Sequence, residues 1–253
     1  MTPPIALQLY TVRDQLTQDY EGTIRKVADM GYLGVETANM FGDSPAWAAK
    51  LFGELGLTVS GAHGPLPLGD KKQEVIDTLG ALSCRRLILP WQPPEMYKSL
   101  DGIKSVCDLL NEGAAVAKAN GFKLGYHNHW FEYELLENRI PADLMLEHLD
   151  PDVFLEVDVY WVQTAGQNPV EVVRRLGSRA PLLHIKDGPC QIEEPMTALG
   201  EGVVDIPSVV AAGAGSTEWL VVELDHCATD MMEAVRKSYQ YLIGRGLARG
   251  NKN

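Results

Sequence analysis

Short apolar segments alternate with longer segments of helical periodicity eight times along the 253-residue chain. The strand-like segments are Ile5–Tyr10, Gly34–Thr37, Leu57–His63, Arg86–Pro90, Lys123–His129, Val153–Trp161, Pro181–Lys186 and Trp219–His226. The helix-like segments that follow them are Asp19–Met30, Ser44–Leu55, Lys72–Leu82, Ser99–Asn120, Pro141–Leu149, Pro169–Leu176, Ile206–Ala212 and Thr229–Ile243. This alternation predicts parallel strands, because each helix must carry the chain back to the start of the next strand.

The repeat number and the chain length together favour one architecture. Eight such units, with no Pro- or Ser-rich linker between them, favour a closed barrel over an open sheet or two small domains. No glycine-rich phosphate-binding motif follows any strand, which argues further against a nucleotide-binding sheet. The sequence therefore predicts a single (β/α)8 TIM barrel over residues 1–253. Its longest loop, at 187–205, is typical of a lid or a binding loop.

Histidines and carboxylates gather where the strand-like segments end. Five of the six histidines lie at such ends, namely His63, His127, His129, His184 and His226. Only His148 lies within a helix-like segment, and Glu36, Asp158 and Glu223 occupy three further strand ends. Because the carboxyl ends of all strands in such a barrel open at one mouth, we expect these side chains to form one cluster.

The residue types in this cluster suit a metal ion. Strand alternation places Asp158 on the same face as Glu156, so that it points into the barrel. Carboxylate oxygens and one imidazole, from Asp158, Glu223 and His184, suit a divalent cation such as Mn²⁺, Mg²⁺, Co²⁺ or Zn²⁺. Such an ion stabilises the enediolate formed when a base removes the proton beside a carbonyl group. Glu132, Glu223 and the histidines are the available bases.

Each of these residues also has a structural alternative. Asp158 and Glu223 can form a buried ion pair with Lys186 instead of binding a metal. Glu36 and His63 can contact a substrate or serve as hydrogen-bonded structural residues. The aromatic residues Trp91, Trp130, Phe131 and Trp161 can wall a sugar pocket or simply pack in the core.

The charge balance and the cysteine pattern exclude several classes of partner. Lys and Arg total 22 against 34 Asp and Glu, a net charge of −12, so we expect no nucleic acid partner. No apolar stretch approaches the roughly 20 residues needed to cross a bilayer, so we expect no membrane partner. The four cysteines lie far apart and the first residues show no signal-peptide pattern, which favours a cytoplasmic protein.

Several motifs follow one another in a fixed order, namely Gln8–Asp14, Gly31–Tyr32, Gly34–Glu36, Tyr126–His129, Phe131–Glu132, Asp158–Val162, Ala165–Gly166, His184–Asp187, Gly200–Asp205 and Glu223–Asp225. With this order and spacing the chain resembles the xylose-isomerase-like TIM barrels. The resemblance is to the sugar phosphate isomerase/epimerase branch, which includes inosose dehydratases and ketohexose 3-epimerases, and it runs nearly end to end. It implies one divalent ion at the barrel mouth, held by a Glu, an Asp, a His and a Glu after strands five to eight.

The resemblance assigns three ligands directly and leaves the fourth open. Asp158, His184 and Glu223 match the family positions after strands six, seven and eight. Many epimerases carry a carboxylate where His127 stands here, and that carboxylate works as a pair with the strand-eight glutamate. Glu132 is the nearest carboxylate in this chain, so the resemblance makes it the fourth ligand, with His127 as the alternative.

The resemblance implies an enzyme that isomerises or epimerises a small sugar through an enediolate, with Glu132, Glu223 and His127 as catalytic residues. The histidine-rich end of strand five is closer to the dehydratase-like members, and it favours the alternative of a dehydratase or lyase acting on a keto-sugar or keto-cyclitol. We expect substrate contacts from five further residues, Glu36, His63, His129, Trp161 and Lys186. No cluster of Arg or Lys marks a phosphate pocket, so an unphosphorylated substrate is favoured.

Two further hypotheses come from other classes. An abasic-site endonuclease shares this barrel and metal location, but it needs more metal ligands and a basic surface than six histidines and a net charge of −12 provide. A sugar-binding barrel without catalysis is the other, and the retained ligand set argues against it. Homo-oligomers are common in the family, although nothing in the sequence fixes an interface.

Overall fold

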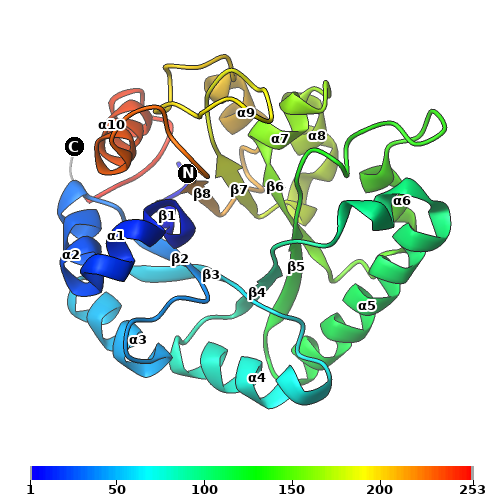
Figure 1. Ribbon diagram of the computed structural model, residues 1–253, viewed down its shortest axis with the longest axis horizontal. Coiled ribbons are helices and arrows are strands. Elements are labelled where there is room, and N and C mark those ends of the chain that lie inside the picture. Colours follow the sequence, from blue (N-terminus) through cyan, green and yellow to red (C-terminus); the bar gives the residue numbers. More distant parts are fainter. Residues whose placement is uncertain (1, 252–253) are drawn as a thin grey trace.

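A computed structural model describes residues 2–251, and its strands form a closed, all-parallel barrel in chain order (Figure 1). The strands are β1 (Ile5–Gln8), β2 (Gly34–Ala38), β3 (Thr58–His63), β4 (Arg86–Leu89), β5 (Lys123–His127), β6 (Phe154–Asp158), β7 (Leu182–Ile185) and β8 (Trp219–Val222). The barrel closes where β8 pairs with β1, with Ile5 opposite Leu220. The predicted (β/α)8 architecture is confirmed.

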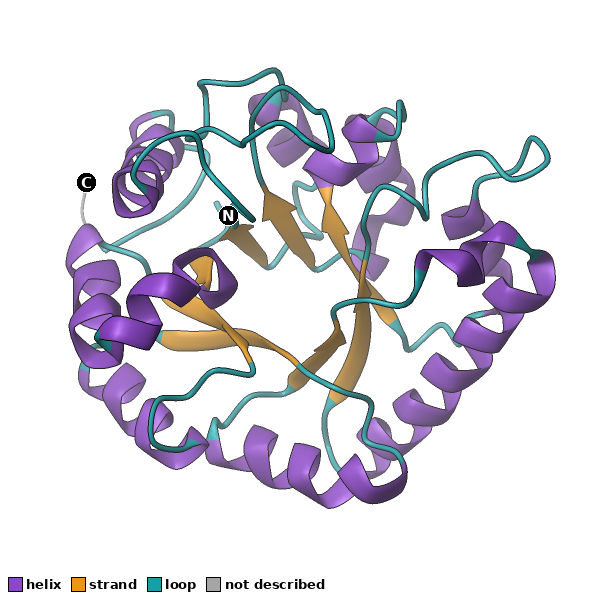
Figure 2. Ribbon diagram, in the orientation of Figure 1, coloured by secondary structure: helices purple, strands orange, loops and turns teal. Residues whose placement is uncertain are grey.

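Helices surround the barrel on all sides (Figure 2). They are α1 (Arg13–Gln18), α2 (Tyr20–Met30), α3 (Pro45–Glu54), α4 (Lys72–Ala81), α5 (Leu100–Ala119), α6 (Pro141–His148), α7 (Val159–Thr164), α8 (Pro169–Leu176), α9 (Ile206–Ala212) and α10 (Met231–Gly244). Within residues 2–251, no helix is both long and apolar enough to cross a membrane.

Several strands end earlier than the sequence predicts, and at two of them a helix begins at once. The first strand stops at Gln8, and the chain turns into a 3₁₀ helix over Leu9–Val12 and then into α1, which was not predicted. The sixth was predicted to run to Trp161, but β6 ends at Asp158. Asp158 accepts a hydrogen bond from the Trp161 backbone N–H at 3.1 Å and so begins α7. Aromatic and β-branched residues after Asp158 favour a strand locally, and the N-cap overrides that preference.

The interior of the barrel has an apolar part toward the amino-terminal ends of the strands and a polar part toward their carboxyl ends. Ile88, Phe154 and Leu182 fill the apolar part, with Trp219 packed against them. Farther along the same strands come polar residues, for example Glu156 and then Asp158 on β6, so the strand alternation predicted for this segment is confirmed. These four apolar residues, which we call the plug, close the amino-terminal end of the barrel, and the polar residues face its mouth.

Gly125 makes room for this plug. A Cβ atom at this position would lie 2.3–2.6 Å from three ring atoms of Phe154. We therefore expect Gly125→Ala to lower the free energy of unfolding by about 3 kcal/mol, at the upper end of the cost of overpacking. Gly80→Ala on α4 is the control, because its Cβ would meet nothing within 4 Å. Urea denaturation should show a slight stabilisation for this control, as alanine favours a helix, and equal effects of the two variants would contradict the prediction.

The long loop predicted at 187–205 connects β7 to α9, and a buried carboxylate organises it. Asp187 is fully buried and accepts hydrogen bonds from the backbone N–H groups of four residues, Gly188, Gly200, Gly202 and Val204. The loop is therefore anchored beside the mouth of the barrel.

Candidate active site

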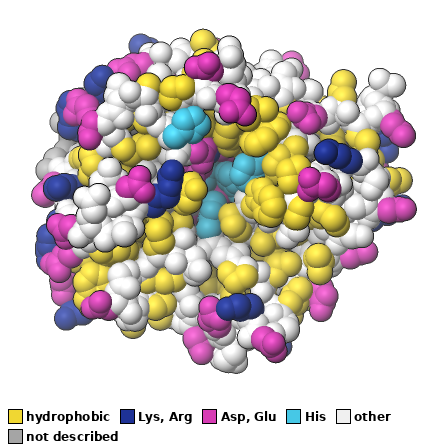
Figure 3. Space-filling view, viewed as in Figure 1, with side chains coloured by type: hydrophobic (Ala, Val, Ile, Leu, Met, Phe, Trp, Pro, Cys, Tyr) yellow, Lys and Arg dark blue, Asp and Glu magenta, His cyan; other side chains and the backbone are white. Residues whose placement is uncertain are grey.

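A cavity of about 540 Å³ opens at the carboxyl ends of the strands. Histidine and acidic side chains gather in the hollow at the centre of this face (Figure 3). The lining residues are Tyr10, Ala38, Asn39, His63, Gly64, Pro65, Leu89, Pro90, Trp91, His127, His129, Glu223 and Asp225. Three of the five strand-end histidines, His63, His127 and His129, do meet Glu223 at one mouth, whereas His184 is fully buried and His226 lies exposed outside the cavity.

Four residues, which we call the mouth group, bring potential metal ligands together: His127, Asp158, His184 and Glu223. One ligand atom from each lies within 4.8 Å of the others, and all four residues are buried. Nε2 of His127 has no hydrogen-bond partner although it is buried, and it lies 3.4 Å from Oδ2 of Asp158. Two imidazoles and two carboxylates with an unpartnered nitrogen fit a divalent cation with mixed N and O ligands.

The fully buried Lys186 sits against the same carboxylates. Its Nζ lies 3.0 Å from Oδ2 of Asp158, 2.8 Å from Oε2 of Glu223 and 2.7 Å from Oδ2 of Asp225. The ion pair considered as a structural alternative is thus present. Burial alone would lower the pKa of Lys186, but the three carboxylates outweigh it and raise that pKa well above its ordinary value.

One ammonium group does not balance the carboxylates of the mouth group. Burial opposes their ionisation, but Lys186 and the adjacent histidines lower the pKa of both Asp158 and Glu223. Glu156, Glu223 and Glu36 overcome the effect of burial and raise the pKa of His184 well above its ordinary value, so a protonated imidazole supplies the remaining positive charge. A divalent cation would take the place of that proton and fits the donor atoms.

Glu132, the residue predicted as the fourth ligand, lies outside the mouth group. Its Oε1 accepts a hydrogen bond from the Tyr126 hydroxyl at 2.5 Å, and its Oε2 accepts one from the His129 backbone N–H at 2.8 Å. Burial raises the pKa of Glu132 to about 8, so its carboxyl group is largely neutral at pH 7. His127, the alternative that the sequence left open, is the residue that the structure groups with Asp158, His184 and Glu223, and both oxygens of Glu132 are engaged elsewhere.

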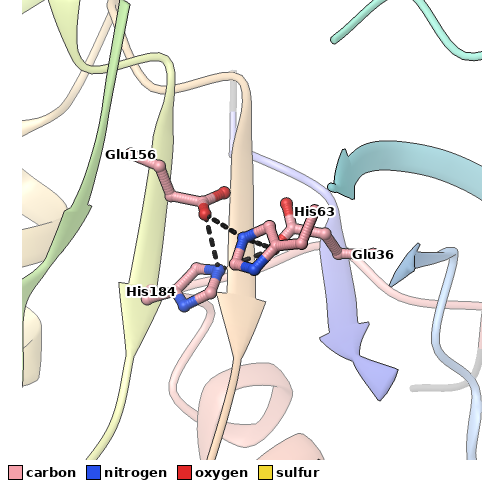
Figure 4. Close-up of side chains that lie close together, drawn as sticks. All are labelled: Glu36, His63, Glu156 and His184. Atoms are coloured by element: carbon pink, nitrogen blue, oxygen red, sulfur yellow. Dashed lines mark hydrogen bonds and ion pairs between the residues drawn. The ribbon is translucent and has the colours of Figure 1, made fainter. Parts of the chain in front are cut away.

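A second cluster, which we call the floor group, lies deeper in the barrel and shares His184 with the mouth group (Figure 4). It consists of Glu36, His63, Glu156 and His184. Glu36 was predicted to contact substrate, but it is fully buried beneath the cavity and does not line it. His63, in contrast, lines the cavity.

Glu156 and Asp225 were not among the residues predicted for the site. Glu156 precedes Asp158 by two positions on β6, and Asp225 follows Glu223 by two positions. Residues two apart along an extended chain share a face, so alternation was the signal that could have found both. The carboxylate of Asp225 faces Lys186 and lines the cavity.

The remaining predicted substrate contacts form an aromatic wall beside the mouth group. The ring of His129 stacks on Phe131, and Trp161 lies 6.5 Å from His129, centroid to centroid, with its ring 5.4 Å from Nζ of Lys186. Burial lowers the pKa of His129 to about 3, so its imidazole is neutral. His129 lines the cavity, whereas Trp161 is buried behind it.

Comparison with known proteins gives a match to the family described as xylose isomerase-like TIM barrel, over residues 24–243. The inosose dehydratase of Geobacillus kaustophilus (strain HTA426) is 26% identical over 200 residues, which cover 69% of this chain and 63% of that protein. The chain thus spans less than two thirds of that relative.

Two solved structures share the fold over nearly the whole chain. A sugar phosphate isomerase/epimerase from Parabacteroides distasonis ATCC 8503 superimposes with a TM-score of 0.84 at 23% identity, covering 98% of this chain and 96% of its own. IolI protein with a bound zinc atom superimposes with a TM-score of 0.74 at 15% identity, covering 96% of this chain and 97% of its own.

Proposed function

This chain belongs to the xylose isomerase-like TIM barrel family, and from that premise we propose that it is a divalent-metal-dependent enzyme that acts on a small sugar or cyclitol. His127, Asp158, His184 and Glu223 would hold the ion. When bound, the ion would act as a Lewis acid toward a substrate carbonyl group and the negative charge that develops beside it. The inosose dehydratase and the zinc-containing relative support this class of substrate and cofactor.

Within this class we favour elimination from a keto-sugar or keto-cyclitol. The observation that carries this choice is the imidazole of His127 in the position where a symmetric epimerase needs a second carboxylate, since Glu132 faces away from the mouth group. Glu223 is ionised and lines the cavity, so it can remove the proton beside the ketone. The bond from the β-carbon to its oxygen then breaks, and a histidine of the cavity wall protonates the departing oxygen.

The other residues of the site have supporting roles in this proposal. Lys186 steadies the negative charge on the carboxylates, because its ammonium lies among them. His129, which is neutral, offers a hydrogen bond to a substrate hydroxyl. No Arg or Lys of the described chain lines the cavity, which favours an unphosphorylated substrate and argues against the phosphodiester of a nuclease.

Isomerisation or epimerisation is the second candidate. Asp225 favours it, because this second carboxyl group lines the same cavity as Glu223 and can return a proton to a different face or carbon. Both reactions begin with removal of a proton beside a carbonyl group. They differ only in the second step, which is either loss of the β-oxygen or return of a proton to carbon.

A reaction in D₂O followed by NMR separates these outcomes. Metal-free protein, prepared with a chelator, is reloaded with Mn²⁺, Mg²⁺, Co²⁺ or Zn²⁺ and supplied with neutral inososes, ketohexoses and 3-keto-glycosides. Elimination removes a hydroxyl or alkoxyl group and leaves an enol with a vinylic signal or, after ketonisation, a 1,2-diketone, whereas epimerisation retains every carbon–oxygen bond and exchanges only the hydrogen beside the carbonyl group for deuterium. We expect the metal-free protein to lose at least about 100-fold in rate, given the several kcal/mol that a Lewis acid contributes. Full activity without metal would refute the proposal.

A further inference from the structure

The floor group contains two fully buried carboxylates that share two imidazole nitrogens. Nε2 of His184 lies 2.7 Å from Oε1 of Glu36 and 3.2 Å from Oε2 of Glu156. Nε2 of His63 lies 2.6 Å from the same oxygen of Glu156 and 3.1 Å from that of Glu36. Figure 4 shows the two rings side by side between the carboxylates. Each ring therefore directs one nitrogen to the floor of the site.

The other nitrogen of His184, Nδ1, faces the mouth group. Nδ1 of His184 lies 2.8 Å from Oε2 of Glu223. We propose that Glu36 and Glu156 are positioning residues that keep the Nε2 proton of His184 on the floor side, so that Nδ1 is presented to the divalent cation. This inference rests on the proposed metal-dependent function and adds two residues to its machinery.

The physical reason lies in the tautomers of a neutral imidazole. A histidine that binds a metal uses one nitrogen as ligand and carries its proton on the other. A carboxylate that accepts a hydrogen bond from that proton fixes the tautomer, orients the ring and makes the ligating nitrogen more basic. Glu36 and Glu156 both stand at Nε2, so Nδ1, which faces Glu223, is the nitrogen presented to a cation.

Glu36 is itself held on two sides. The amide nitrogen of Gln8 donates a hydrogen bond to its Oε1 at 2.7 Å. Its Oε2 packs toward Gly61, where a Cβ atom would lie only 2.6 Å away. Gln8 and Gly61 lie on strands β1 and β3, which flank β2. Residues of the neighbouring strands thus hold the Glu36 carboxylate in place, and this carboxylate in turn orients His184.

His63 allows both carboxylates to be buried. Two buried carboxylates that shared only one imidazole would be costly in the interior of the barrel. His63 brings a second imidazole to the pair and interacts with both. The alternative is that the floor group binds a second cation of its own. We favour the mouth group as the cation site, because it contains the unpartnered Nε2 of His127, whereas Nε2 of both floor-group histidines lies within hydrogen-bond distance of a carboxylate.

The test measures zinc affinity and the tautomer of His184, neither of which depends on turnover. Glu36→Leu removes the nearer acceptor, Glu36→Gln keeps a carbonyl acceptor, and Glu201→Gln is the matched control on the surface, where the Glu201 carboxylate pairs with Lys237. We expect Glu36→Leu to weaken Zn²⁺ binding by about 10- to 100-fold, as is typical for a partner behind a metal-bound histidine. Glu36→Gln should restore much of this loss, and Glu201→Gln should bind like wild type.

Long-range ¹H–¹⁵N NMR of zinc-loaded, histidine-labelled wild type reads the tautomer directly, whether or not Glu36→Leu folds. Zinc on Nδ1 of His184 with a proton on Nε2 supports the inference. Zinc on Nε2, two zinc ions per chain, or wild-type affinity in a folded Glu36→Leu protein would overturn it while the proposed function stands. Wild type that binds no divalent ion would overturn the proposed function, and this inference with it.

Discussion

Asp158→Asn is expected to abolish activity and to weaken divalent cation binding by at least about 100-fold, more than the loss typical of a residue behind a ligand. The substitution keeps the size of the side chain and changes its charge and ligand chemistry. Oδ1 of Asp158 caps α7 by accepting the Trp161 N–H, and the amide oxygen of asparagine can do the same. Oδ2 becomes an NH₂ group, which cannot bind a cation.

The protein should remain folded after this change. Lys186 loses one carboxylate partner but keeps Glu223 and Asp225. Asp205→Asn provides a control of the same chemistry, because Asp205 also caps a helix through its side chain, at the exposed start of α9. Isothermal titration with Zn²⁺ and Mn²⁺ should show wild-type affinity for Asp205→Asn and none measurable for Asp158→Asn. Retained binding in a folded Asp158→Asn protein would remove Asp158 from the ligand set.

The barrel could be predicted from the sequence because its signal is repeated. Each apolar run and each helical period is ambiguous alone, but eight alternations in this length fit few other folds. Local chemistry was harder to foresee. The stretch Val159–Val162 reads as a strand by composition, and only the cap provided by Asp158 turns it into a helix.

The candidate site was predictable in its location and only partly in its members. The mouth collects every residue that ends a strand, so His127, His184 and Glu223 could be placed together before the structure was known. The direction of a side chain that follows a strand end could not be predicted in the same way. Glu132 lies five residues beyond His127, in a loop. Its carboxyl group points toward Tyr126, because it accepts hydrogen bonds there from the Tyr126 hydroxyl and the His129 backbone N–H. No periodicity in the sequence predicts this side-chain direction.

Glu132→Gln is expected to stabilise the metal-free protein at alkaline pH. Burial raises the pKa of Glu132 from its ordinary value of 4.5 to about 8. The folded chain therefore holds this proton more tightly than the unfolded chain does. Its contribution to stability is complete below about pH 4.5 and is lost as the pH rises through about 8. The difference between the two pKa values corresponds to roughly 5 kcal/mol at most.

Glutamine can replace the protonated acid at this position with little strain. Its carbonyl oxygen can accept the His129 N–H, and its amide group can donate to the Tyr126 hydroxyl. Tyr126 in turn contacts the hydroxyl of Tyr97, so its own proton has an acceptor. Because glutamine does not ionise, the variant should lack the loss of stability that ionisation of Glu132 causes in wild type.

Urea denaturation from about pH 5 to about pH 9 in the presence of a chelator measures this difference. The stability of Glu132→Gln relative to wild type should rise with pH, and Glu134→Gln, an exposed neighbour in the same loop, should run parallel to wild type. His63 and the other groups titrate in all three proteins and cancel in the comparison. Parallel curves for wild type and Glu132→Gln would show that Glu132 is ionised in the fold. In the same variant Zn²⁺ affinity should be retained, because His127, rather than Glu132, completes the mouth group.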